Sequence, residues 1–288
     1  MNTQQSLGGG GGKQKHLFKE EKITILQSDQ NNAIMNNKFS KGGVSMKKSF
    51  TLAEVLITLG IIGVVAAMTM PTLIQKQNEK KDIVHLKKVY SILNQALLKE
   101  ISENGTVDLW GLAKTDTGAK DDDGLIVLDN SGREKLAAIF KKHLKVVAQP
   151  DISFESIPIY NMGGVQNMPE AQGYSIKNTL YLADGTIIKF GYIRSCTDWC
   201  ADIAVYLKSS NGKYTQGRNT FYFHLDKDKI YPAGMQNATV YPFEETCKYG
   251  STERQNGRGC TAWAIFNENM DYLHCSDLSW EGKRTCKE

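Results

Sequence analysis

The sequence lacks the short motifs that identify common catalytic sites. It has no nucleotide-binding glycine loop, no nucleophile elbow and no paired-histidine metal motif. The histidines beyond residue 49 are scattered, and each is more typical of a packing or surface residue than of a catalyst. They are His85, His143, His224 and His274. These absences argue against an enzyme and predict no cofactor.

The sequence also lacks a charge imbalance outside its N-terminal part. The 288 residues have a net charge of +4, but residues 1–49 hold eight lysines against Glu20, Glu21 and Asp29. The remaining residues carry 27 basic and 28 acidic side chains. A nearly neutral body gives no support to polyanion binding, so we expect no direct contact with nucleic acid.

No cysteine occurs before residue 196. The six cysteines are Cys196, Cys200, Cys247, Cys260, Cys275 and Cys286. Their number and clustering are typical of a disulfide framework in an oxidising compartment. A zinc site would be expected to show Cys-x-x-Cys pairs, whereas three residues separate the closest pair here, so we predict no metal site. Spacing alone leaves all fifteen full pairings open, and we expect nearest-neighbour pairs because they close short loops. These are Cys196–Cys200, Cys247–Cys260 and Cys275–Cys286.

One acidic cluster interrupts the sequence between residues 116 and 124. Asp116, Asp121, Asp122 and Asp123 precede Gly124. They lack the alternating spacing and the distal Glu of an EF-hand, so the pattern favours a solvated loop over a calcium site.

One long apolar segment, residues 49–76, dominates the sequence. No charged side chain lies between Val55 and Gln75. As a helix with a rise of about 1.5 Å per residue this span covers roughly 31 Å, which is enough to cross a bilayer. A secretory signal peptide would have a shorter apolar region followed by a small-residue cleavage site. The sequence therefore predicts a membrane helix over about residues 50–75, with the lipid bilayer as a partner.

Glu54 lies just inside this apolar run. A carboxylate there costs a few kcal/mol on membrane-insertion scales unless it has a partner. A cut between Ser49 and Phe50 would create an amine close to Glu54 along the helix, and the two groups could pair within one chain or between chains. The alternative is that Glu54 lies at the membrane interface and reaches water.

The sequence FTLAE at residues 50–54, followed by an apolar helix, resembles the processing motif of type IV prepilins and type II secretion pseudopilins. The resemblance implies that a prepilin peptidase cuts before Phe50, methylates its amine and leaves the helix in the product. Ser49 stands where the family usually has Gly. Gly63 and Pro71 lie where family members commonly carry the same residues. Gly63 permits close helix approach, and Pro71 is expected to bend the helix.

The resemblance also implies the partners and the location. Other pilin or pseudopilin subunits would contact the N-terminal helix through Glu54, Gly63 and Pro71. The protein would be a single-pass protein of the bacterial cytoplasmic (inner) membrane, and periplasmic or extracellular when assembled. Lysines flank the segment on both sides and do not decide its orientation. The cysteines do, because a disulfide-bearing domain belongs outside the cytosol.

Residues 1–49 are expected to form a leader, of which the first 45 residues show no sustained periodicity and are expected to lack regular structure. If Lys41, Gly42 and Gly43 are encoded by AAA-GGA-GGT, these codons would form a ribosome-binding sequence upstream of Met46. The true start is then Met46, and residues 1–45 are upstream sequence. The alternative is a long leader.

After Pro71, apolar residues from Ile83 to Ile101 recur at spacings of three and four, which indicates an amphipathic helix. One long helix is therefore expected over residues 50–104, followed by a globular extracytoplasmic head domain over residues 105–288. A helix is expected at 133–144. Strands are expected at 174–176, 179–182, 186–192, 203–207, 220–225 and 261–266. The predicted fold is α+β, with the long helix packed on an antiparallel sheet.

Two functions remain open at this stage. The first is a structural subunit of a type IV pilus or a type II secretion pseudopilus. The second is a membrane-anchored extracytoplasmic binding protein, such as an adhesin.

Overall fold

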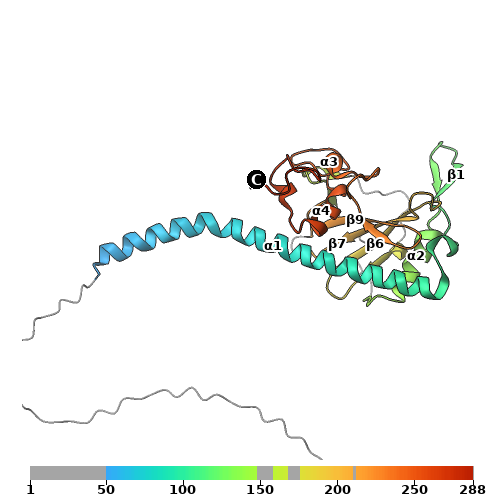
Figure 1. Ribbon diagram of the computed structural model, residues 1–288, viewed down its shortest axis with the longest axis horizontal. Coiled ribbons are helices and arrows are strands. Elements are labelled where there is room, and N and C mark those ends of the chain that lie inside the picture. The colour runs from blue at the N-terminus through green and yellow to red at the C-terminus, as the bar shows by residue number, and fades with distance from the viewer. Residues whose placement is uncertain (1–49, 148–157, 168–175, 210–211, 288) are drawn as a thin grey trace, which may run out of the picture. The chain divides into compact units, whose positions relative to one another are not determined.

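The computed structural model describes residues 50–147, 158–167, 176–209 and 212–287. Its first element is one long helix, α1 (Leu52–Asn104), and the residues after it form an α+β domain built on an antiparallel sheet (Figure 1). The expected fold class is confirmed. The leader, with Ser49 and the alternative start at Met46, lies outside the described residues.

The second half of α1 is amphipathic, as its apolar spacing predicts. Its buried side chains are Ile83, Leu86, Val89, Leu93, Ala96, Leu97 and Glu100. The helix ends at Asn104, and Gly105 has a φ of 75°. The Gly105 N–H donates to the carbonyl oxygen of Ile101 at 2.9 Å. Glycine takes this left-handed conformation without strain, which ends the helix here.

A five-stranded antiparallel sheet, in the order β10-β9-β7-β6-β5, forms the centre of the head domain. Its strands are β5 (Thr179–Tyr181), β6 (Ile187–Ile193), β7 (Ala201–Tyr206), β9 (Thr220–Leu225) and β10 (Ile230–Pro232). Four of them lie within a residue or two of the expected strands. Gly185 has a φ of 86° in the turn between β5 and β6, which is the turn that Asp184-Gly185 predicts.

Two helices cover one face of this sheet. Phe190, Ile203 and Phe223 are opposite one another on neighbouring strands, so their side chains share a face. The Tyr90 ring of α1 stacks on Phe223 with ring centres 5.5 Å apart. Phe140 of α2 (Ser131–Lys141) meets Phe190 at 5.1 Å. The amphipathic half of α1 and α2 therefore share one core with the sheet.

Two small sheets complete the β structure. β1 (Asp116–Lys120) and β2 (Ile126–Leu128) form a hairpin. β3 (Ile159–Tyr160) pairs with β4 (Gln166–Asn167) antiparallel and with β8 (Tyr214–Thr215) parallel. Of the residues expected to form a solvated loop, Asp121 to Gly124 do form the exposed hairpin turn, but Asp116 lies in β1, where the prediction was wrong.

Short helices occupy the rest of the head domain. They are η1 (Val107–Leu109), η3 (Ile176–Asn178), α3 (Phe243–Thr246), η4 (Arg258–Cys260), α4 (Thr261–Phe266) and η5 (Asp271–Leu273). Two strand predictions were wrong. Residues 261–266 are the helix α4, and Ile176 begins η3, while the other two residues of that expected strand lie outside the described residues.

The structure contains three disulfides, in keeping with the predicted framework. They join Cys196 to Cys200, Cys247 to Cys260 and Cys275 to Cys286, the same nearest-neighbour pairs that the spacing analysis gives. Cys247 directly follows α3 and Cys260 directly precedes α4. Beside this link, the Phe243 and Trp263 rings stack with centres 4.1 Å apart. The Cys247–Cys260 and Cys275–Cys286 disulfides thus cross-link segments within the C-terminal part of the head domain, whereas Cys196–Cys200 lies in the connection between β6 and β7.

Three pairs of histidine and carboxylate join α1 to the head domain. Glu79 contacts His274 at 2.9 Å, His85 contacts Asp184 at 3.2 Å and Glu100 contacts His143 at 2.6 Å. In each pair, one residue is on α1 and its partner lies more than 40 residues further along the chain. The histidines therefore act as packing and pairing residues between elements.

Asp184 predicts a pH-dependent part of this attachment. Partial burial raises the pKa of its carboxyl group, but hydrogen bonds from Thr186, Lys88 and His85 outweigh burial and hold the pKa below its usual range. A lowered folded-state pKa contributes stability above the ordinary pKa near 3.8, and this stability is lost as the pH falls through the folded value. We expect Asp184→Asn to destabilise the protein by about 1 kcal/mol at pH 7 and by less below pH 3. Urea unfolding of both proteins across this range measures the difference, and a constant difference would contradict the prediction.

Candidate functional site

The first turn of α1 contains a capping box formed by Thr51 and Glu54. The Thr51 backbone N–H donates to Glu54 Oε2 at 2.8 Å, and the Glu54 N–H donates to Thr51 Oγ1 at 3.2 Å. The Thr51 hydroxyl also donates to Glu54 Oε2 at 2.9 Å. Two backbone N–H groups that the helix cannot satisfy are thereby paired, which fixes where α1 begins.

This arrangement gives Glu54 a local partner that the sequence analysis missed. From the sequence, the expected partner of Glu54 is an amine created by cleavage or, as the alternative, water at the membrane interface. The signal was present, because Thr51-Leu52-Ala53-Glu54 is the Thr-x-x-Glu pattern that opens helices. Glu54 thus has a role in the uncut chain, as a helix cap. Any role in assembly would come in addition to it.

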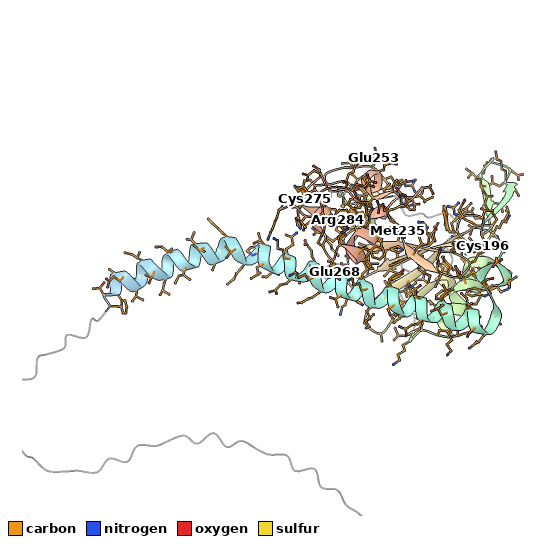
Figure 2. The ribbon with its side chains drawn as sticks, in the orientation of Figure 1. Cys196, Met235, Glu253, Glu268, Cys275 and Arg284 are labelled. Atoms are coloured by element: carbon orange, nitrogen blue, oxygen red, sulfur yellow. A yellow bond between two sulfur atoms is a disulfide. The ribbon has the colours of Figure 1, made fainter. Side chains whose placement is uncertain are left out.

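The first half of α1 presents an apolar surface that the described residues do not cover. Phe50 is 84% exposed and Leu52 is 79% exposed. In its most apolar stretch, with a mean hydropathy of 2.2, no residue is buried. Figure 2 shows side chains standing out along this part of the helix. The stretch is long and apolar enough to cross a membrane.

Gly63 and Pro71 lie within this apolar half. A Cβ atom at Gly60 or Gly63 would meet nothing within 4 Å, so no contact among the described residues requires glycine there.

Pro71 lies inside α1, which continues through it. The Thr69 and Thr72 hydroxyls donate to the carbonyl oxygens of Val65 and Thr69 at 3.0 and 2.9 Å. Figure 1 shows that α1 curves within its blue-to-cyan part.

The structure brings together only part of the predicted processing and assembly set. Glu54 contacts Thr51, which is not among the predicted residues, and the predicted Phe50 directly precedes Thr51 in the chain. Gly63 and Pro71 lie further along the same helix. Ser49 lies outside the described residues, so the predicted cleavage site itself is not described.

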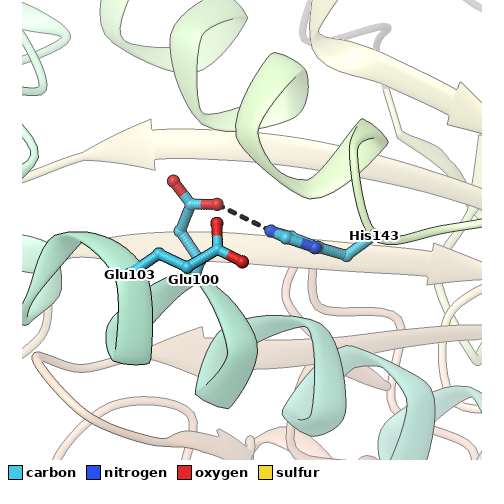
Figure 3. A group of neighbouring side chains, drawn as sticks. All are labelled: Glu100, Glu103 and His143. Carbon is cyan, nitrogen blue, oxygen red and sulfur yellow. Dashed lines mark hydrogen bonds and ion pairs between the residues drawn. The ribbon is translucent and has the colours of Figure 1, made fainter.

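A second cluster of ligating side chains lies where α1 ends. One ligand atom from each of Glu100, Glu103 and His143 lies within 4.8 Å of the others (Figure 3). The buried Glu100 carboxylate accepts hydrogen bonds from His143 Nε2 at 2.6 Å and Asn104 Nδ2 at 2.8 Å. Burial raises the pKa of Glu100, but His143 and Lys142 outweigh burial and keep the pKa below its usual range. Glu100 therefore lies as a paired carboxylate against the end of α2.

The surroundings of His143 argue against a metal centre here. A histidine that binds a metal normally donates its other ring N–H to a hydrogen-bond partner. His143 Nδ1 is buried and has no such partner among the described residues. Lys142 Nζ already lies 3.5 Å from Glu100 Oε1 and supplies a positive charge. The cluster fits a structural contact, in which Glu100 of α1 pairs with Lys142 and His143 at the end of α2, better than a metal site.

These observations define a class: an α+β domain with three disulfides, carried on one helix long and apolar enough to cross a membrane. Residues 72–278 match the model of a family of unknown function, DUF6613, and the chain belongs to this family. The match covers the amphipathic half of α1 and most of the head domain, and it begins after the FTLAE segment. Comparisons with curated proteins and with solved structures gave no match.

Proposed function

We propose that this protein is a structural subunit of a type IV pilus or a type II secretion pseudopilus-like filament. The observation that carries the proposal is the first turn of α1. There the prepilin-like sequence at residues 50–54 opens a helix whose apolar surface is left uncovered by the other described residues. In a filament, the same helices of other subunits cover this surface after it leaves the membrane. The function is structural, and no enzymatic activity is proposed.

The proposed location follows from the apolar helix and the disulfides. α1 crosses the bacterial cytoplasmic membrane with its N-terminus inside, where prepilin peptidase acts. The head domain lies outside, because its disulfides form in an oxidising compartment. Gly60 and Gly63 then permit close approach of neighbouring helices.

Cleavage by prepilin peptidase is the direct test of this proposal. Coexpression of the full chain with an active prepilin peptidase is expected to give a product that begins at Phe50 and carries one methyl group on its amine. Intact-protein mass spectrometry of the membrane fraction measures both features. Ser49→Trp is the matched control, because the bulky side chain replaces the small residue before the cut and should leave the chain uncut.

An uncut chain beside an active peptidase would refute the processing step. It would favour the alternative function, a membrane-anchored extracytoplasmic binding protein such as an adhesin. The same spectra also test the start site, because an uncut chain that begins at Met46 lacks residues 1–45.

A further inference from the structure

The β1–β2 hairpin has an apolar run that the other described residues leave exposed. Leu125, Ile126 and Val127 are 50%, 53% and 41% exposed. Successive side chains of a strand point to opposite faces, so both faces of this hairpin carry exposed apolar groups. Figure 1 shows the hairpin projecting from the head domain. A run of exposed apolar residues on a projecting strand is typical of a contact surface.

The tip of the hairpin is acidic and has a defined shape. Asp121 Oδ1 accepts hydrogen bonds from the N–H groups of Asp123 and Leu125 at 3.1 and 2.8 Å, which holds the turn. Gly124 takes a φ of 78° there. The side chains of Asp122 and Asp123 are exposed. The tip thus presents two carboxylates that the turn itself does not require.

A groove of the opposite charge lies between α2 and β5. Its volume is about 620 Å³, and its apolar lining includes Val146, Val147 and Leu180. Three lysines line it: Lys135, Lys141 and Lys177. Among the described residues, Glu134 is the one acidic side chain that lines it, and it lies 4.0 Å from Lys177. The groove therefore combines an apolar floor with a net positive rim.

We propose that the β1–β2 hairpin of one copy docks into the groove between α2 and β5 of a second copy. The apolar run Leu125 to Val127 would cover the floor of the groove. Asp122 and Asp123 would meet the lysines on its rim. This partner is favoured because the two surfaces match in both charge and polarity. The inference rests on the proposed filament, and it names the contact between neighbouring head domains within it.

The geometry of such a contact suits an open assembly. The hairpin and the groove are different surfaces, so the contact is heterologous: each copy offers a free hairpin at one side and a free groove at another. Heterologous contacts that do not close into a ring continue as a helical filament. The contact would therefore add to the packing of the N-terminal helices and set the position of each head relative to the next.

Site-specific photo-crosslinking in membranes tests the docking. The full chain carries a benzophenone amino acid at Ile126, and cross-linked peptides are mapped by mass spectrometry. We expect cross-linked dimers whose second peptide lies within residues 131–147 or 177–181. The same probe at Glu253, which is exposed and outside the hairpin, should not give these peptides.

Charge reversal makes the test specific. Asp122→Lys with Asp123→Lys, or Lys135→Glu with Lys141→Glu, should lower the dimer yield about tenfold because both exposed charge contacts become repulsive. Combining all four substitutions should restore the yield, which also shows that the variants fold. Asp228→Lys with Glu253→Lys makes the same change in net charge as the aspartate pair, but outside the hairpin, and should leave the yield unchanged.

The outcomes separate the docking from the filament proposal. Cross-links to the groove without filaments would support the docking and overturn the filament. Filaments without these cross-links, or single reversals that leave the yield unchanged, would overturn the docking. Lack of rescue by the combined variant would also overturn it.

Discussion

Replacing Glu54 by Ala is expected to remove the protein from filaments while leaving it in the membrane. A carboxylate in an apolar helix opposes insertion, so its loss should leave insertion equal or easier. If Glu54 pairs with the Phe50 amine of a neighbouring subunit, its loss leaves a buried charge unpaired at a cost of several kcal/mol. Recovery in sheared filaments should then fall by roughly 100-fold or more. Quantitative immunoblotting of sheared and membrane fractions measures the two amounts.

The capping box supplies the controls for this experiment. Glu54→Gln keeps an acceptor for the Thr51 N–H, since Gln also serves in capping boxes, but it removes the charge. Thr51→Val keeps the charge and removes the hydroxyl that accepts from the Glu54 N–H, which should cost about 1 kcal/mol of helix stability. If Glu54 acts through its charge, the Gln variant fails to assemble and the Val variant assembles. The reverse result would assign Glu54 to the cap alone, and equal recovery of Glu54→Ala and wild type would reduce it to a passive residue.

Leu93→Ala is expected to lower the free energy of unfolding of the head domain by about 2–5 kcal/mol. The Leu93 side chain is fully buried on the face of α1 that lies in the core shared with the sheet. Its truncation removes apolar contacts and leaves a cavity between α1 and the sheet. The close-packed core can shift only partly to fill this cavity. Urea unfolding of the full chain in detergent, followed by tryptophan fluorescence, measures the loss.

Leu98→Ala is the matched control, with the same substitution on the same helix. Leu98 is 60% exposed, so its truncation should change the free energy of unfolding by less than about 0.5 kcal/mol. Equal effects of the two substitutions would mean that α1 does not depend on its buried face for stability.

The elements with a long or strongly periodic pattern could be predicted from the sequence. α1 follows from its apolar run and from the three-and-four spacing that continues to Gly105. β7 and β9 follow from short apolar runs. α4 could not be predicted in the same way, because Thr261 to Ile265 are all buried and the segment has no polar face to reveal a helical period. Short apolar runs do not distinguish a strand from a buried helix, and only the surrounding core decides.

The candidate site was predictable where it is local. The Thr51–Glu54 capping box follows from four consecutive residues, although its signal was overlooked. The pair of Glu100 and His143 was not predictable, because it joins residues 43 positions apart and depends on how α2 packs beside α1. The groove between α2 and β5 also depends on packing. Its lysines, scattered over more than 40 residues, gave no pattern.

The long separation between α1 and its partner strands has a consequence during synthesis. Tyr90 on α1 donates a hydrogen bond to the carbonyl oxygen of Ile230, 140 residues later. Part of the apolar stripe of α1, around Tyr90, therefore stays uncovered until the chain has been made to about residue 230. At about 5–20 residues per second this takes roughly 7–30 seconds. During that interval the nascent chain exposes this apolar part of the helix face. A nonsense mutation before β9 would leave the face exposed permanently, in a product that chaperones and proteases recognise.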